Sequence, residues 1–194
     1  MKENQDMQFD YNSLVSALVG GACTLVGVGI AHHLESLKQS KKEADEIKGV
    51  LNGVHVELET LWSTYIEKMG TTVEQLNKNE PLTYYWPVSQ NYFVFYETNS
   101  SKIASIPDKR LQQQIVEVYC LLKSLIDSFR MNNQLLAKFD HAVDIHNVEN
   151  TKASYQRMDI CHKTLLDYAN KLKDSHEVTS IAIVPLLRSL RVTC

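Results

Sequence analysis

Residues 111–139 read LQQQIVEVYCLLKSLIDSFRMNNQLLAKF, and this stretch decides the fold class of the chain. Its apolar residues recur at intervals of three and four, which is the period of one face of an α-helix. The predicted core face comprises Leu111, Ile115, Val118, Tyr119, Leu122, Leu125, Ile126, Phe129, Leu136 and Phe139. Pro107 and Asp108 precede it and are suited to the start of a helix. The pattern therefore predicts a long amphipathic helix that buries one face.

The segments on either side of this helix show the same period. Apolar residues line one face of residues 34–69 and again of residues 151–175, so both are predicted to be helices. Asn147–Asn150 is expected to be the break before the second of them. The expected fold class is therefore all-α, with the helices packed as a bundle. Pro185 leaves the conformation of the tail, residues 177–194, undecided.

The chain between the first two long helices is harder to assign. Gly70 is expected to end the first helix, and the capping-box pattern of Thr71–Glu74 to start a short one. Residues 81–87, PLTYYWP, lack a helical period and predict an aromatic connector. Residues 89–97 are predicted to form a short helix, although NYFVFY also suits a strand.

The N-terminal part contains an apolar stretch. Residues 13–31, SLVSALVGGACTLVGVGIA, carry no charge over nineteen residues. At about 1.5 Å per residue a helix of this length covers most of a hydrocarbon core about 30 Å thick. We therefore expect a leader at residues 1–12, a transmembrane helix at 13–33 and one domain at 34–194. A cleaved signal peptide and a buried core helix are the alternatives, but the leader is not basic and no cleavage site follows Ala31.

Charge and cysteine usage predict the orientation of that span. Lys38, Lys41, Lys42 and Lys48 follow it closely, whereas the leader has a single lysine. The positive-inside rule then places the N-terminus outside and residues 34–194 in the cytoplasm, with the span in a bacterial inner membrane. The cysteines are scattered, which suits a reducing compartment.

Small residues in the same stretch indicate self-association. Ala17 and Gly21 form a small-xxx-small pair, and Gly20 and Gly27 are seven residues apart. Small side chains on one stripe let helix backbones approach closely in lipid. A homo-oligomer packed through these four residues is expected, with the lipid bilayer as its other partner.

Composition and motifs narrow the function. The net charge is −3, and the part beyond residue 31 is close to neutral, which argues against a binder of DNA or RNA duplexes. The sequence contains no Walker loop, GxGxxG, GxSxG, HExxH or paired-cysteine motif. We therefore predict a protein that is not an enzyme, with no catalytic residues, no cofactor and no metal site.

Candidate ligand-binding residues lie in two places. Tyr84 and Tyr85 offer aromatic faces in the connector, where bases could stack. Arg130, Asn132 and Asn133 interrupt the apolar pattern of the long helix and could contact phosphate and base edges. The alternative is that the polar group faces solvent and the tyrosines edge the core.

A short leader, the glycine-rich stretch SLVSALVGGACTLVGVGIA and a helical domain of this size resemble the membrane-anchored effectors of bacterial antiphage defence. These include the cyclic-oligoadenylate-gated membrane proteins of type III CRISPR systems and similar abortive-infection proteins. The resemblance implies an oligomer whose cytosolic domains bind a nucleotide second messenger, a cyclic oligoadenylate, and whose spans then disrupt the membrane. The alternative function is a constitutive membrane tether or scaffold that recruits a cytosolic protein partner.

Overall fold

The chain folds into helices. A computed structural model describes residues 11–77, 79–88 and 91–193, apart from the side chains of 11–19, 21–26 and 193. In these residues there is no strand, which confirms the all-α prediction. The elements are α1 (Tyr11–Tyr65), η1 (Ile66–Gly70), α2 (Thr71–Gln75), α3 (Val94–Thr98), α4 (Ser100–Ala104), α5 (Lys109–Glu149) and α6 (Lys152–Thr193). The chain divides into two units, Met1–Glu46 and Ile47–Cys194.

The first unit contains residues 11–46 of α1. Every residue of this unit whose side chain is described is exposed to solvent. Gln39 donates to Glu43 one turn further along, with 2.8 Å between the nitrogen and the oxygen. Side-chain contacts between residues four positions apart stabilise an exposed helix.

The predicted transmembrane helix at 13–33 and the inner-membrane localisation require correction. None of the helices in the described part of the chain is long and apolar enough to cross a bilayer. A span takes about 20 mainly apolar residues. Within 13–33 the exposure is described only for positions 20 and 27–33. Charged residues follow from Glu35 onward.

The expected self-association surface falls partly outside the described residues. Ala17 and Gly21 have no described side-chain surroundings. A Cβ added at Gly20 or Gly27 would have no atom of another helix or loop within 4 Å among the described residues. Homo-oligomer formation through these positions therefore stays a prediction.

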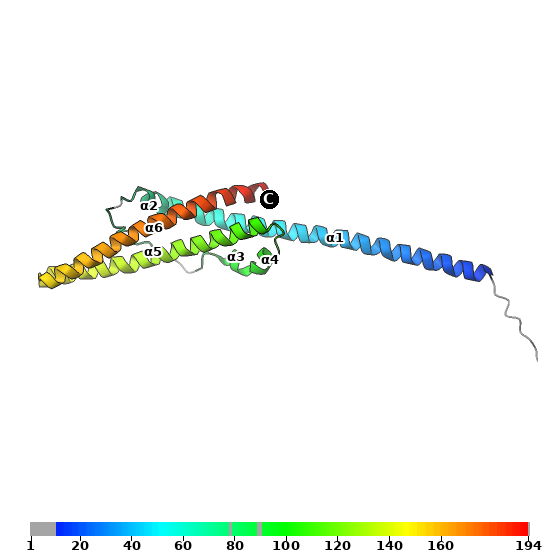
Figure 1. Cartoon of the computed structure of the whole chain (residues 1–194), viewed down its shortest axis with the longest axis horizontal. Coiled ribbons are helices and arrows are strands. Elements are labelled where there is room, and N and C mark those ends of the chain that lie inside the picture. The colour runs from blue at the N-terminus through cyan, green and yellow to red at the C-terminus, as the bar shows by residue number, and fades with distance from the viewer. Residues whose placement is uncertain (1–10, 78, 89–90, 194) are drawn as a thin grey trace, which may run out of the picture. The chain divides into compact units, whose positions relative to one another are not determined.

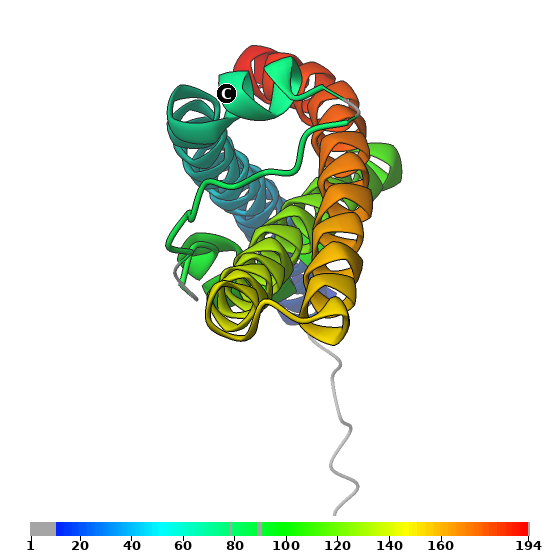
Figure 2. The same ribbon diagram turned by 90° about the vertical axis from the view of Figure 1, so that its left-hand side faces the viewer.

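The second unit is built on three long helical segments: residues 47–65 of α1, α5 and α6. Figures 1 and 2 show α5 and α6 side by side along much of their length. Asn150 joins them in a left-handed conformation with φ 48°. Its N–H donates to the carbonyl of His146 at 2.8 Å, which ends α5. The hydroxyl of Ser154 and the backbone of Thr151 bond to each other at the start of α6.

The predicted start of α5 is confirmed. The Asp108 carboxylate accepts from the N–H groups of Arg110 and Leu111 at 2.9 and 3.1 Å, so it caps the helix. The helix extends to Glu149. Of the residues predicted to form the break, Asn147–Asn150, only Asn150 lies outside the helix. The tail that the sequence left undecided belongs to α6, which continues through Pro185 to Thr193.

The expected helix stop at Gly70 is wrong. Gly70 has φ −54° and ψ −52°, so the chain stays helical through the π-helical η1 and into α2. The side chains at this junction form no cap, and the predicted capping box of Thr71–Glu74 is absent. The predicted helix at 89–97 begins later, as α3, while residues 89–90 lie outside the described part.

The core of the second unit fills the space between the three long segments. Each fully buried aliphatic side chain stabilises the fold by roughly 1.5–3 kcal/mol relative to an exposed one. The least exposed members are Val54 and Leu58 of α1, Ile115, Val118, Tyr119 and Phe129 of α5, and Leu165, Ala169, Leu172, Ile183, Leu186 and Leu190 of α6. The segment from α2 to α4 contributes the buried residues Val73, Leu82, Phe93 and Ile103 to the same core.

Candidate functional site

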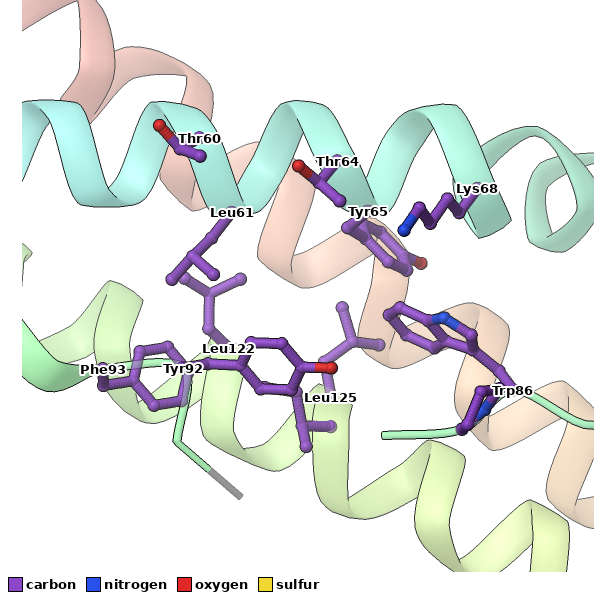
Figure 3. A pocket seen from close by; sticks show the side chains of 12 residues that line it. Thr60, Leu61, Thr64, Tyr65, Lys68, Trp86, Tyr92, Phe93, Leu122 and Leu125 are labelled. Atoms are coloured by element: carbon purple, nitrogen blue, oxygen red, sulfur yellow. The ribbon is translucent and has the colours of Figure 1, made fainter. Parts of the chain in front are cut away.

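A pocket of about 370 Å³ opens between α1, the connector and α5 in the second unit. We call it the aromatic pocket, and it is lined by Thr60, Leu61, Thr64, Tyr65, Lys68, Trp86, Pro87, Tyr92, Phe93, Leu122, Leu125 and Ile126. Figure 3 shows Tyr65, Lys68 and Trp86 together at one end, Phe93 at the other, and Tyr92 between them.

Packed aromatic rings form the end of the pocket at Trp86. The centroid of the Trp86 ring lies 4.6 Å from that of Phe129, in an edge-to-face arrangement. The Tyr65 ring lies 5.7 Å from Trp86 and 5.9 Å from Phe129. Such pairs are worth about 0.5–1.5 kcal/mol beyond the area they bury. The three rings therefore hold the connector against α1 and α5.

Few polar groups line the pocket, and Lys68 is the only charged one among its described residues. Lys68 is exposed and belongs to η1, the π-helical turn between α1 and α2. Single π-helical turns are rare in proteins, and those that occur are often found at functional sites. The hydroxyls of Thr60 and Thr64 stand one turn apart on α1 on the same side of the pocket (Figure 3).

Behind Tyr65 a row of polar groups leads away from the pocket, through the buried His176 to the exposed Glu74. The Tyr65 hydroxyl and Nδ1 of His176 are 2.7 Å apart, and Nε2 of His176 is 3.4 Å from the Glu74 carboxylate. His176 is 4% exposed and its ring stacks on that of Trp62. Burial, with a smaller contribution from the negative charge of Glu74, raises the pKa of Tyr65 well above its ordinary value.

Two of the residues predicted to bind ligand form hydrogen bonds to the connector. Asn133 donates to the Trp86 carbonyl at 2.6 Å and accepts from the Trp86 N–H at 3.2 Å. Asn132 is completely buried and donates to the Leu82 carbonyl at 3.0 Å, while its own oxygen has no hydrogen-bond partner among the described residues. These amides satisfy the backbone of a segment that has no regular structure of its own.

The other three candidates lie apart from these contacts. Arg130 pairs with Asp127 at 2.7 Å and lines a smaller recess of about 200 Å³ with Tyr92, Phe93, Glu97 and Lys123 among others. Tyr84 and Tyr85 are 57% and 62% exposed. The described lining of the aromatic pocket includes none of the five predicted residues.

Glu57, which the sequence did not single out, positions the far wall of the pocket. Its carboxylate accepts from the N–H groups of Phe95 and Tyr96 at 2.7 and 3.1 Å, at the start of α3. It also accepts from the Tyr119 hydroxyl at 2.7 Å. A carboxylate at a helix N-terminus is stabilising, so Glu57 fixes α3 and the neighbouring Phe93 to α1 and α5.

Only some residues of the aromatic pocket could be recognised as candidates from the sequence. Trp86 and Tyr92 stand in a dense run of aromatic residues, whereas Tyr65 and Lys68 look like ordinary positions of an amphipathic helix. The described residues contain no group of three or more His, Cys, Asp or Glu arranged to hold a metal ion. Comparisons of the chain with family models, with curated proteins and with solved structures give no significant match.

Proposed function

We propose that residues 47–194 form a ligand-sensing domain that binds a small aromatic molecule with one anionic group in the aromatic pocket. The observation behind this proposal is the make-up of the wall, where the rings of Trp86, Tyr92 and Phe93 line a pocket whose one charged group is Lys68, at the Trp86 end. Aromatic rings stack on flat ligands, and an ammonium group at the edge attracts an anion. A volume of about 370 Å³ lies within the range of small-molecule sites.

A nucleotide belongs to this class of ligand, since its base is flat and its phosphate is anionic. The pocket suits one nucleotide unit better than a whole cyclic oligoadenylate, because its volume lies near the lower end of the range for ligand sites. Nucleotide second messengers of antiviral defence therefore stay among the candidate ligands. The membrane step expected from the sequence is not part of this proposal.

Sensing follows from the origin of the pocket walls. They come from α1 with η1, from the connector and the residues 92–93 that follow it, and from α5. A ligand that contacts all three favours the arrangement in which they are closed on each other, and this difference in affinity shifts the equilibrium between arrangements. The domain would report the ligand through the position of the connector, without a chemical step.

Fluorescence titration tests the proposal, because the chain has two tryptophans and only Trp86 lines the pocket. In a Trp62→Phe background, 1-anilinonaphthalene-8-sulfonate should change the Trp86 emission saturably, and AMP and cyclic tetra-adenylate should be titrated in parallel. Lys68→Met should weaken binding of the sulfonate about tenfold. The same substitution should leave the affinity for the uncharged N-phenyl-1-naphthylamine unchanged. Lys171→Met, an exposed lysine of α6 outside the pocket, is the matched control.

Two results would count against the proposal. Absence of saturable binding by all four compounds would overturn it and favour a scaffold that recruits a protein partner. Equal weakening of the charged and the uncharged probe by Lys68→Met would show that the pocket does not select an anion.

A further inference from the structure

We propose that Tyr65, His176 and Glu74 make anion binding in the aromatic pocket proton-linked: as the ligand binds, His176 takes up one proton from solvent and the Tyr65 hydroxyl turns to donate to the ligand. The inference rests on the proposed function, because it concerns the ligand of the same pocket. It assigns Tyr65 as a specificity-determining residue and His176 as its positioning residue.

With His176 neutral, the geometry assigns the Tyr65 hydrogen to the histidine. Nε2 of His176 lies 3.4 Å from a Glu74 carboxylate oxygen, and a carboxylate repels a lone pair, so the tautomer with the hydrogen on Nε2 and the lone pair on Nδ1 is favoured. The Tyr65 hydroxyl, 2.7 Å away, donates to that lone pair. Its oxygen then offers the pocket only lone pairs, which repel an anion.

With His176 protonated, the direction of the same contact reverses. Both ring nitrogens are then donors, so Nδ1–H donates to the Tyr65 oxygen and Nε2–H stays beside the Glu74 carboxylate. The Tyr65 hydrogen must leave Nδ1, and the pocket that Tyr65 lines is the space next to it. Tyr65 keeps its proton in this state, because burial raises its pKa. The pocket thereby gains a donor near Lys68, and an anion binds this form more tightly.

The charged groups around His176 are compatible with the added proton. From α2 the Glu74 carboxylate faces the imidazole. The Glu74 side chain is 59% exposed, so the Tyr65–His176–Glu74 contacts reach solvent at Glu74. On α6 itself, Lys173 donates to the carbonyls of Glu74 and Leu76 at 3.0 and 2.7 Å, and Glu177 is exposed. α1 contributes the uncharged Trp62 ring, and α5 reaches this cluster through Phe129 against Tyr65. Lys68 of η1 lines the pocket on the far side of Tyr65.

The test uses 1-anilinonaphthalene-8-sulfonate, whose sulfonate stays ionised across the range in which histidine titrates, about pH 5–8. Binding to the full chain should weaken as pH rises, by up to about tenfold per pH unit at the steepest point, because proton uptake and ligand binding are linked. Calorimetry in two buffers of different ionisation enthalpy should show uptake of up to one proton per ligand. His176→Gln and Tyr65→Phe should each flatten the pH dependence, and His162→Gln, on the same helix, should retain it.

The outcomes separate the two proposals. If the wild-type chain and His176→Gln bind the sulfonate with the same pH dependence, the proton-linked contact is wrong and the ligand pocket stands. If the wild-type chain does not bind the sulfonate at any pH, the proposed function itself fails. Should His176→Gln not fold, the exposed Glu74→Gln replaces it. This variant removes the charge that stabilises the imidazolium, so its pH profile should move to lower pH, and an unmoved profile would contradict the inference.

Discussion

Tyr119 of α5 donates its hydroxyl hydrogen to the Glu57 carboxylate of α1, with 2.7 Å between the two oxygens. The same carboxylate accepts from two backbone N–H groups at the start of α3. One side chain therefore ties together the two long helices and the short helix between them in sequence. The bundle and the wall of the aromatic pocket depend on the same contact.

Glu57→Gln should destabilise the second unit by about 1–3 kcal/mol, because a carboxamide presents one acceptor oxygen where three donors converge. The measurement is urea unfolding, read as a lower midpoint with an unchanged slope. Glu67→Gln, an exposed glutamate of η1, is the control and should stay within about 0.5 kcal/mol of wild type. Equal midpoints for the two variants would contradict the role of Glu57.

Two glycines of α1 should respond in opposite directions to the same substitution. A Cβ at Gly53 would collide with the Phe95 ring, whereas one at Gly49 would have no described atom of another segment within 4 Å. Gly53→Ala should therefore cost about 1–3 kcal/mol through displacement of Phe95. Gly49→Ala should stabilise the helix by about 0.5–1 kcal/mol, since alanine loses less backbone entropy. Thermal unfolding of both variants measures the difference, and stabilisation by both would show that Phe95 does not pack there.

Asn133→Ala should release the connector at Trp86, because it removes both hydrogen bonds to the backbone of that residue. In a Trp62→Phe background the emission of Trp86 should shift to longer wavelength as the indole becomes more exposed to water. Gln134→Ala, at the exposed neighbouring position, serves as the control. An unshifted spectrum would mean that the aromatic packing alone holds Trp86.

Alkaline pH should destabilise the bundle through Tyr119. Burial, followed by the hydrogen bond to Glu57, raises the pKa of Tyr119 above its ordinary value of 10.0. The folded state therefore holds a proton that the unfolded state has lost above about pH 10, so stability is complete below that pH and falls as pH rises. Tyr119→Phe should flatten the decline of the unfolding midpoint between about pH 9.5 and 11. The exposed Tyr84→Phe should not flatten it.

The sequence determined the helices of the bundle. The apolar face of residues 111–139 lies in the core with only Ile126 and Phe139 half-buried, and Asp108 caps the helix as its position predicts. Such features are local: the period of apolar residues reports which face is buried, and a cap needs only its own first turn. The membrane span was predicted from the length and apolarity of the N-terminal stretch alone, and the described helices do not support it.

Only the tertiary structure decided which polar residues face inward and what they bond. Asn132 and Asn133 break the apolar pattern and look solvent-facing or ligand-facing in the sequence, yet both are buried against the connector. Tyr65 and His176 are 111 positions apart, and no local pattern marks them as partners. A buried polar group takes whichever partner the packed helices bring to it, so its role depends on contacts between distant segments. Periodicity records burial averaged along one helix and carries no information about such pairs.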